Sequence, residues 1–182
     1  MKKIYDFKAC IIFFTGISAS GKSTLCLSLQ KKFKKLNIKK IKNIDGDFLR
    51  NKLKNFNYEK DSRDKIGNIK MSIAKNFSKK GNIVLVSGIA HNKEWRKKIK
   101  EKNKDYFEIF VKCPLKTCEK RDYKFQYTKA KSGEIKDFIG ISEPYQIGKS
   151  HDLIINTSRL SVSMGINKVF NFLKKKNYVF TK

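Results

Sequence analysis

Residues 16–23, which read Gly-Ile-Ser-Ala-Ser-Gly-Lys-Ser, constrain this chain more than any other segment. They fit the pattern of a glycine, four residues, and then Gly-Lys-Ser or Gly-Lys-Thr. An apolar run at residues 9–14 precedes them, and a helix-compatible stretch at residues 24–29 follows. In this context glycine lets backbone N–H groups turn toward one anion, and the helix N-terminus adds partial positive charge. The segment therefore predicts a phosphate-binding loop for a nucleoside triphosphate.

The side chains of this loop have expected roles toward the nucleotide. Lys22 would reach the β- and γ-phosphates, and the Ser23 hydroxyl would hold Mg²⁺. A glycine-rich turn that binds no ligand is the alternative interpretation, which the flanking strand and helix argue against. The residues expected to bind the nucleotide are Gly16, Ser18, Ala19, Ser20, Gly21, Lys22, Ser23 and Thr24.

The size of the chain predicts a single globular domain over residues 1–182, since 40% of the residues are hydrophobic. No apolar run reaches the roughly 18 residues of a membrane span. The charged N-terminus lacks an apolar signal core separate from the first strand. We therefore expect a cytoplasmic protein with no membrane partner. The four cysteines are not spaced as zinc or redox pairs, so reduced structural thiols are expected.

The net charge of +27 comes mostly from lysine, in runs such as residues 31–32, 34–35, 39–40 and 174–176. A specific nucleic-acid reader more often concentrates arginine and aromatic residues in one element. We therefore expect no specific nucleic-acid partner, and a compositional bias toward lysine explains the charge equally well. A nucleotide-dependent nucleic-acid-binding protein is kept as an alternative, because the charge would attract nucleic acid at low salt.

Strands and helices are predicted to alternate along the chain. We expect strands at about residues 9–15, 40–44, 83–86, 106–111 and 152–156. Helices are expected from the phosphate loop to about residue 36, from near residue 48, and at 62–80, 93–103, 115–121 and 162–175. Residues 122–144 are polar and predict an irregular, mobile lid. This pattern predicts a three-layer α/β fold with a five-stranded parallel sheet, which binds ligands at the carboxyl ends of its strands.

An acidic motif, Asp45-Gly46-Asp47, follows the second predicted strand. A carboxylate opposite the γ-phosphate can orient an acceptor hydroxyl and take its proton, or help to hold Mg²⁺ through water. Asp47 is our choice for this role and Asp45 the second choice, with helix capping as the alternative for either. Arg50 lies one helical turn after Asp47 and would face the same site. An exposed surface arginine is its alternative.

These segments resemble the adenylylsulfate kinase family, which uses ATP to phosphorylate the 3′-hydroxyl of adenosine 5′-phosphosulfate (APS). The resemblance runs from Ile11 to about Thr157 and includes the phosphate loop and the acidic motif with Arg50. Its most specific part is YTKAKSGEIKDFIGI at residues 127–141. The resemblance implies a phosphate-loop kinase fold and ATP as the nucleotide.

The resemblance also implies roles for individual residues. Phe56 and Phe138 would sandwich the base of the acceptor, although either could be ordinary core. Arg121 would pack on the ATP adenine. The residues that would contact the acceptor are Asp45, Arg50, Phe56, Arg63, Asn68, Ile89, His91, Lys124, Lys129 and Phe138. The family is commonly dimeric, which makes a homodimer an expectation.

Three departures from the family pattern concern the acceptor side. The family's Phe-Ile-Ser-Pro-Phe/Tyr-Arg is Gly-Ile-Ala-His-Asn-Lys here, at residues 88–93. Its Asp-Arg-x-x-Asn pattern matches either Arg63 or Asn68 in register, but not both. Its Asp-Pro-Lys-Gly-Leu-Tyr is Asp-Tyr-Lys-Phe-Gln-Tyr at residues 122–127. His91 could hydrogen-bond the terminal group of a different substrate, and a solvent-exposed loop histidine is the alternative.

We therefore expect a kinase that phosphorylates the ribose 3′-hydroxyl of APS in sulfate activation. The first alternative keeps this chemistry and changes the acceptor to cytidine diphosphoramidate, a nucleotide of capsular polysaccharide biosynthesis. A smaller base between the two phenylalanines and the rebuilt loop at residues 90–92 would suit that substrate. A noncatalytic regulator is a further alternative, although no residue of the phosphate loop is missing.

Overall fold

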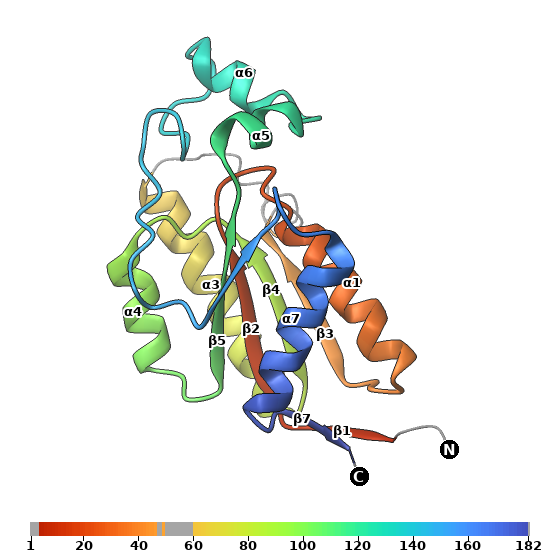
Figure 1. Ribbon diagram of the computed structural model, residues 1–182. Coiled ribbons are helices and arrows are strands. Elements are labelled where there is room, and N and C mark those ends of the chain that lie inside the picture. The colour runs from red at the N-terminus through yellow and green to blue at the C-terminus, as the bar shows by residue number, and fades with distance from the viewer. Residues whose placement is uncertain (1–3, 47–48, 50–59, 182) are drawn as a thin grey trace.

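The computed structural model describes residues 4–46, 49 and 60–181 of the chain, without the side chains of Lys60 and Asp61 (Figure 1). The strands are β1 (Tyr5–Phe7), β2 (Cys10–Thr15), β3 (Ile41–Asp45), β4 (Ile83–Gly88), β5 (Tyr106–Lys112), β6 (Leu153–Asn156) and β7 (Val179–Thr181). The helices are α1 (Lys22–Lys35), α3 (Lys60–Lys79), α4 (Lys93–Glu101), α5 (Leu115–Lys120), α6 (Gln126–Lys131) and α7 (Val162–Lys175). The predicted alternation of strands and helices is confirmed. The helix expected from near residue 48 falls largely outside the described residues.

The central sheet has five strands in the order β3-β4-β2-β5-β6, all paired in parallel. Strand β2 lies at its centre and is buried along its whole length, as is β4 up to Ser87. Continuous apolar runs are typical of strands that helices cover on both faces. The parallel sheet and the α/β class are therefore as predicted.

Alternate residues of the central strands point to opposite faces and build two separate apolar cores. Cys10, Ile12 and Phe14 of β2 belong to one cluster, which α1 and α7 complete. Ile11 and Phe13 belong to the other cluster, which packs against α3 and α4. Figure 1 shows these helix pairs on opposite sides of the sheet. The result is the predicted three-layer arrangement.

Local sequence signals fix several helix ends. Gly81 follows α3 with φ of +80°, a left-handed conformation that glycine adopts without strain. The Asn92 side chain accepts hydrogen bonds from the N–H groups of Glu94 and Trp95 and caps α4. Ser161 caps α7 in the same way, through the N–H of Met164.

The segment at residues 122–144, which we call the lid, differs from the prediction because it is not wholly irregular. It contains α6, and its Tyr127 and Phe138 form a small core together with Cys118 of α5. The Tyr127 hydroxyl donates to the carbonyl of Ser18, 2.9 Å away, and so ties the lid to the phosphate loop. A helix of six residues carries too little periodicity to be predicted among polar neighbours.

A second sheet was not predicted. Strands β1 and β7 pair antiparallel below the main sheet, with Tyr5 opposite Thr181 (Figure 1). Tyr5 and Phe7 pack against the core under α7. Each strand has only three residues and its partner lies at the other end of the sequence, so neither gives a periodic signal by itself.

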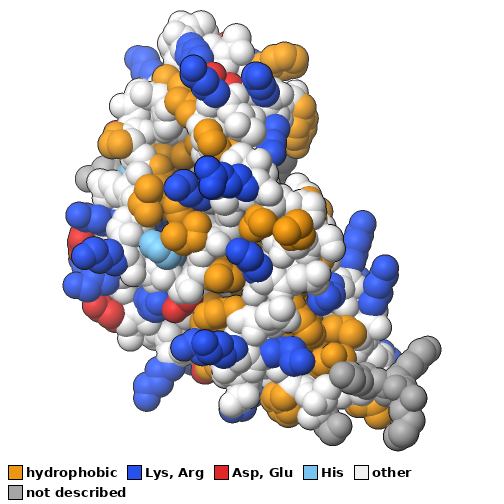
Figure 2. Space-filling model, in the orientation of Figure 1, with side chains coloured by type: hydrophobic (Ala, Val, Ile, Leu, Met, Phe, Trp, Pro, Cys, Tyr) orange, Lys and Arg blue, Asp and Glu red, His pale blue; other side chains and the backbone are white. Residues whose placement is uncertain are grey.

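Basic side chains are spread over the surface. Figure 2 shows Lys and Arg scattered across the visible face between apolar patches, as the dispersal along the sequence led us to expect. In the part of the chain that the structure describes, no helix is long and apolar enough to cross a membrane.

Gly16 provides a test of the turn that leads from β2 into the phosphate loop. Its φ is +151°, and a Cβ atom there would lie 2.5 Å from the carbonyl oxygen of Val111. We expect Gly16→Ala to lower the free energy of unfolding by roughly 1–3 kcal/mol, measured by urea denaturation. Gly133→Ala is the matched control, because Gly133 also has a positive φ but no atom within 4 Å of the added Cβ. Equal losses in the two variants would contradict a role for the Val111 contact.

Candidate active site

A cavity of about 670 Å³ opens at the carboxyl ends of β3 and β4, between the phosphate loop, α3 and the lid. Its position agrees with the rule that parallel sheets bind ligands beyond these strand ends. The charged lining is mostly basic and comprises Lys22, Arg63, Lys70, Arg121 and Lys124, with Asp45, Asp122 and Asp137. Such a lining suits a ligand that carries several negative charges.

The phosphate loop forms one wall of the cavity. Ala19 and Gly21 have positive φ values, 54° and 97°, and Gly21 is the N-cap of α1. The Lys22 ammonium curls back over the loop and donates to the carbonyl of Ile17 at 2.6 Å. Of the predicted nucleotide-binding residues, Ser18, Ala19, Gly21, Lys22, Ser23 and Thr24 line the cavity. Gly16 and the fully buried Ser20 lie outside its lining and support the turn.

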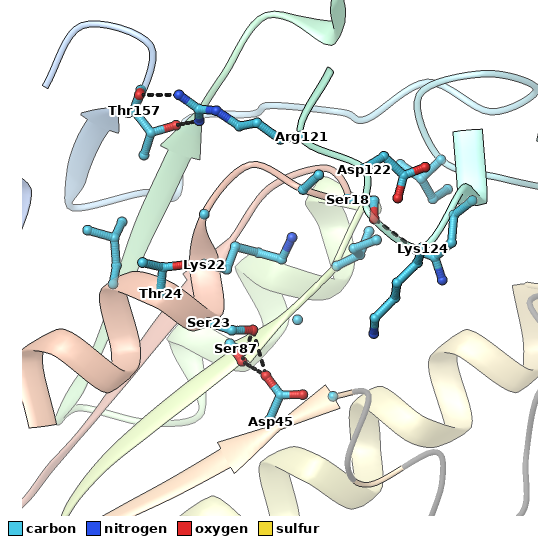
Figure 3. A pocket seen from close by; sticks show the side chains of 18 of the residues that line it. Ser18, Lys22, Ser23, Thr24, Asp45, Ser87, Arg121, Asp122, Lys124 and Thr157 are labelled. Carbon is cyan, nitrogen blue, oxygen red and sulfur yellow. Dashed lines mark hydrogen bonds between the residues drawn. The ribbon is translucent and has the colours of Figure 1, made fainter. Parts of the chain in front are cut away.

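One carboxylate joins three elements at the cavity floor. Asp45 at the end of β3 accepts hydrogen bonds at Oδ2 from Ser23 Oγ (2.7 Å) and Ser87 Oγ (2.6 Å). Ser23 is the second residue of α1, the helix after β2, and Ser87 lies near the end of β4. Figure 3 shows the three side chains pointing toward one another below Lys22. This cluster of oxygen atoms is the best candidate for the chemical centre of the site.

Three predicted site residues, Asp47, Arg50 and Phe56, lie outside the described residues. The structure therefore places neither our first choice of carboxylate nor the first face of the expected base sandwich. It does place Asp45, the second choice, in direct contact with Ser23.

Arg121 lines the end of the cavity that lies beside α7. Its guanidinium donates to the carbonyl of Thr157 at 3.0 Å and approaches the Thr157 hydroxyl at 3.3 Å (Figure 3). Thr157 in turn donates to the carbonyl of Ser20 at 2.8 Å. The flat guanidinium is thus held beside the phosphate loop, next to Leu160 and Val162 of the lining. Thr157 was not predicted, since a single threonine after a strand carries no motif.

The opposite end of the cavity is formed by α3 and the lid. Arg63 Nη1 donates to the carbonyl of Asp137 at 2.6 Å, and Nη2 lies 3.7 Å from Glu143. Phe138 lines the cavity and is 3% exposed, with its ring edge-on to Tyr127 at 5.1 Å. Phe138 therefore belongs to the lid core and to the cavity wall at once.

Two predicted acceptor contacts, Asn68 and Lys129, lie away from the cavity lining. Asn68 accepts a hydrogen bond from Trp95 Nε1 at 3.0 Å, whereas Arg63, the other match to the family pattern, lines the cavity. Lys129 points to solvent and pairs with Glu134 at 2.9 Å. Ile89 and Lys124, by contrast, do line the cavity.

His91 differs from both interpretations of the sequence. It is 6% exposed, so it is not a solvent-exposed loop residue. It also lies outside the large cavity and lines a neighbouring one of about 20 Å³, together with Arg63 and Lys70. Its Nε2 lies 3.9 Å from Glu143. Burial lowers the pKa of His91 below its ordinary 6.5, and Arg63 lowers it further, whereas Glu143 acts in the opposite direction.

The loop after β4 is held through its backbone by Arg96 of α4. This side chain is fully buried and pairs with Glu108 of β5 at 2.9 Å. It also donates to the carbonyl oxygens of Ala90, Gln146 and Ile147. One guanidinium thus joins the predicted acceptor loop to the segment that follows the lid.

Lys70 is the main cavity residue that the sequence reasoning missed as a site residue. It lies on the same face of α3 as Arg63, is 4% exposed, and lines both cavities. In a chain with 43 lysine and arginine residues, no local signal separates one buried lysine from the exposed ones.

Known proteins resemble this chain over nearly its whole length. A family model described as adenylylsulphate kinase matches residues 8–156. The adenylyl-sulfate kinase of Clostridium kluyveri is 35% identical over 179 residues, which cover 96% of this chain and 88% of the relative. That of Geotalea daltonii is 37% identical over 175 residues, which cover 93% and 84%. A solved APS kinase from Mycobacterium tuberculosis, in complex with AMPPNP and APS, superposes with a TM-score of 0.84 at 31% identity, covering 93% of this chain and 99% of that one.

The lowered pKa of His91 predicts a pH-dependent contribution to stability. As the pH falls below about 6.5, the unfolded chain takes up a proton at His91 before the folded chain does. The wild type should therefore lose stability below that pH, whereas His91→Gln should not lose this component. Urea denaturation at about pH 7.5 and about pH 5 measures it, and the stability advantage of the wild type should shrink at the lower pH. A difference between the two proteins that does not change with pH would contradict the prediction.

Proposed function

The chain belongs to the adenylylsulfate kinase family, and we propose that it transfers the γ-phosphate of ATP to the ribose 3′-hydroxyl of APS. The observation that carries the proposal is the Ser23–Asp45–Ser87 cluster, which lies between a phosphate loop and a second anion-binding wall. Phosphoryl transfer needs groups that bind the phosphates of the donor, a carboxylate near the γ-phosphate, and a bound acceptor in the correct position.

ATP would bind along the phosphate loop. The backbone N–H groups at the start of α1 and the Lys22 ammonium would hold the phosphates, and Arg121 would lie against the adenine. A solved relative that holds AMPPNP, an analogue of ATP, together with APS supports ATP and APS as the two ligands. We assign ATP to the end of the cavity beside the phosphate loop and the acceptor to the end beside Arg63 and Phe138.

The residues present fit Mg²⁺ as the metal of the reaction. Magnesium prefers oxygen ligands, and Ser23 Oγ and Asp45 Oδ2 are oxygen atoms held 2.7 Å apart at the cavity floor. When bound, Mg²⁺ would neutralise charge that develops on the β- and γ-phosphates. We assign Ser23 and Asp45 to holding the metal, directly or through water.

The acceptor hydroxyl would be oriented by Asp47, the carboxylate two residues after Asp45. Asp45 is held at the cavity floor by the hydroxyls of Ser23 and Ser87. We therefore assign Asp45 to the metal and Asp47 to the acceptor hydroxyl. Phe138 would offer its face to the base of the acceptor, since aromatic rings stack on bases. Arg63 and Lys124 would meet its charged groups.

Turnover with and without Lys22 tests the proposed reaction. Purified protein with ATP and Mg²⁺ should consume ATP when APS is added, and Lys22→Ala should abolish this turnover because the phosphates lose their cation. Lys31→Ala is the matched control, an exposed lysine on the same helix, and it should keep wild-type turnover. Near-normal activity of Lys22→Ala would remove the assignment. A preference of the wild type for cytidine diphosphoramidate over APS would keep the chemistry and change the acceptor.

Asp45→Asn tests the cavity floor. The substitution keeps the size of the side chain but removes its charge, so we expect kcat to fall by roughly 10²-fold or more. The Mg²⁺ concentration needed for half-maximal rate should rise, because a charged oxygen ligand is lost. A variant with a reduced rate but an unchanged Mg²⁺ requirement would move Asp45 from the metal to the acceptor. Asp47→Asn, measured in parallel, should lower kcat without that change in Mg²⁺ requirement.

A further inference from the structure

Lys70 is a buried ammonium in the wall of the acceptor half of the cavity. It lies on α3, two helical turns after Arg63, and is 4% exposed. It borders the large cavity together with Gly46 and Gly88, the residues at the ends of β3 and β4. It also borders the small cavity beside His91 and Ile89, on the side of the loop after β4. These neighbours place Lys70 at the ends of β3 and β4, on the side where the loop after β4 begins.

The room for this ammonium comes from Gly88. A Cβ atom at Gly88 would lie 2.1 Å from Lys70 Nζ and 3.4 Å from Lys70 Cε. Any side chain at position 88 would therefore displace the ammonium. A Cβ at Gly46 would lie 3.1 Å from the same Nζ atom, so the side chain fills the space between the two strand ends. Gly88 is also a position where the sequence departs from the phenylalanine of the family pattern.

The two cationic residues of α3 that line the cavity, Arg63 and Lys70, have different surroundings. Arg63 reaches the lid, through the carbonyl of Asp137 and the carboxylate of Glu143. Lys70 reaches the strand ends on the cavity floor. A charge in this position acts on an anion more strongly than an exposed lysine does, because less water screens the interaction. The pair offers two separated positive charges to an acceptor that carries an anionic group on its ribose.

We propose that Lys70 is a specificity-determining residue that binds the anionic 5′ group of the nucleotide acceptor, in the space that the missing side chain of Gly88 leaves. The proposal rests on the proposed function, since it concerns the acceptor of that reaction. The proposal also couples the two positions, because a lysine at position 70 requires glycine at position 88.

Binding of two acceptor probes tests the role of Lys70. Titration calorimetry would compare APS with adenosine, which lacks the anionic group, on the wild type and on Lys70→Met. Met keeps the length of the side chain up to the position of Lys70 Cε and removes the ammonium group. We expect affinity for APS to fall about 10- to 100-fold, the usual effect of losing a hydrogen bond to a charged group, and affinity for adenosine to stay within about 2-fold. Lys75→Met, which removes an exposed lysine from the same helix, should leave both affinities unchanged.

A double-mutant cycle with Gly88→Ala tests the pairing. Alone, Gly88→Ala should weaken APS binding by displacing the ammonium. In the Lys70→Met background it should add little, because the atom that its Cβ would strike is gone. Additive effects of the two substitutions would overturn the pairing.

Kinetics separate this proposal from the proposed function. If the wild type phosphorylates APS and Lys70→Met binds APS as tightly as the wild type does, the role of Lys70 is overturned and the proposed function stands. Equal losses for APS and adenosine, or a lower kcat with an unchanged KM for APS, would also overturn it, because the residue would then be structural or act on the transfer step. Failure of the wild type to bind or phosphorylate APS would overturn the proposed function itself, and the acceptor assigned to Lys70 with it.

Discussion

The parallel pairing of β3 and β4 on the same side of β2 is the interaction on which the rest of the site depends. It brings the residues after three strands to one edge, although they are far apart in the sequence. Asp45 pairs in register with Ser87 across the two strands, so its carboxylate meets the Ser87 hydroxyl directly. Ser23 joins them from the start of α1. A shift of either strand by one residue would turn these side chains to the other face.

At this edge of the sheet, the effect of a positive charge depends on where its side chain lies. Most lysines that the structure describes are exposed, so water screens their charges. Lys70 of the cavity wall is buried, and there a positive charge has a larger effect on a bound anion. The total charge of +27 therefore describes the surface, whereas the ligand responds to a handful of side chains that the fold selects.

The sequence predicted the central sheet, its flanking helices and the phosphate loop, because buried parallel strands and the glycine-rich motif are local signals. It could not place Asn68 or Lys129, because a shift of one or two residues on a helix decides whether a side chain faces the cavity or solvent. It missed the β1–β7 pair, whose partners lie at opposite ends of the sequence. Lys70 was also invisible as a site residue, since its burial depends on the empty space above Gly88.

The hydrogen bond from Arg96 to the loop after β4 affects which substitutions this loop can accept. Arg96 holds this loop, and the segment beyond the lid, by carbonyl oxygens, and every amino acid has a carbonyl oxygen. The path of the backbone is thus fixed from inside, by a guanidinium paired with Glu108. The side chains at residues 89–91 are left free to be exchanged without moving the frame. A lineage could alter what this loop recognises one residue at a time, while the transfer machinery beside it keeps working.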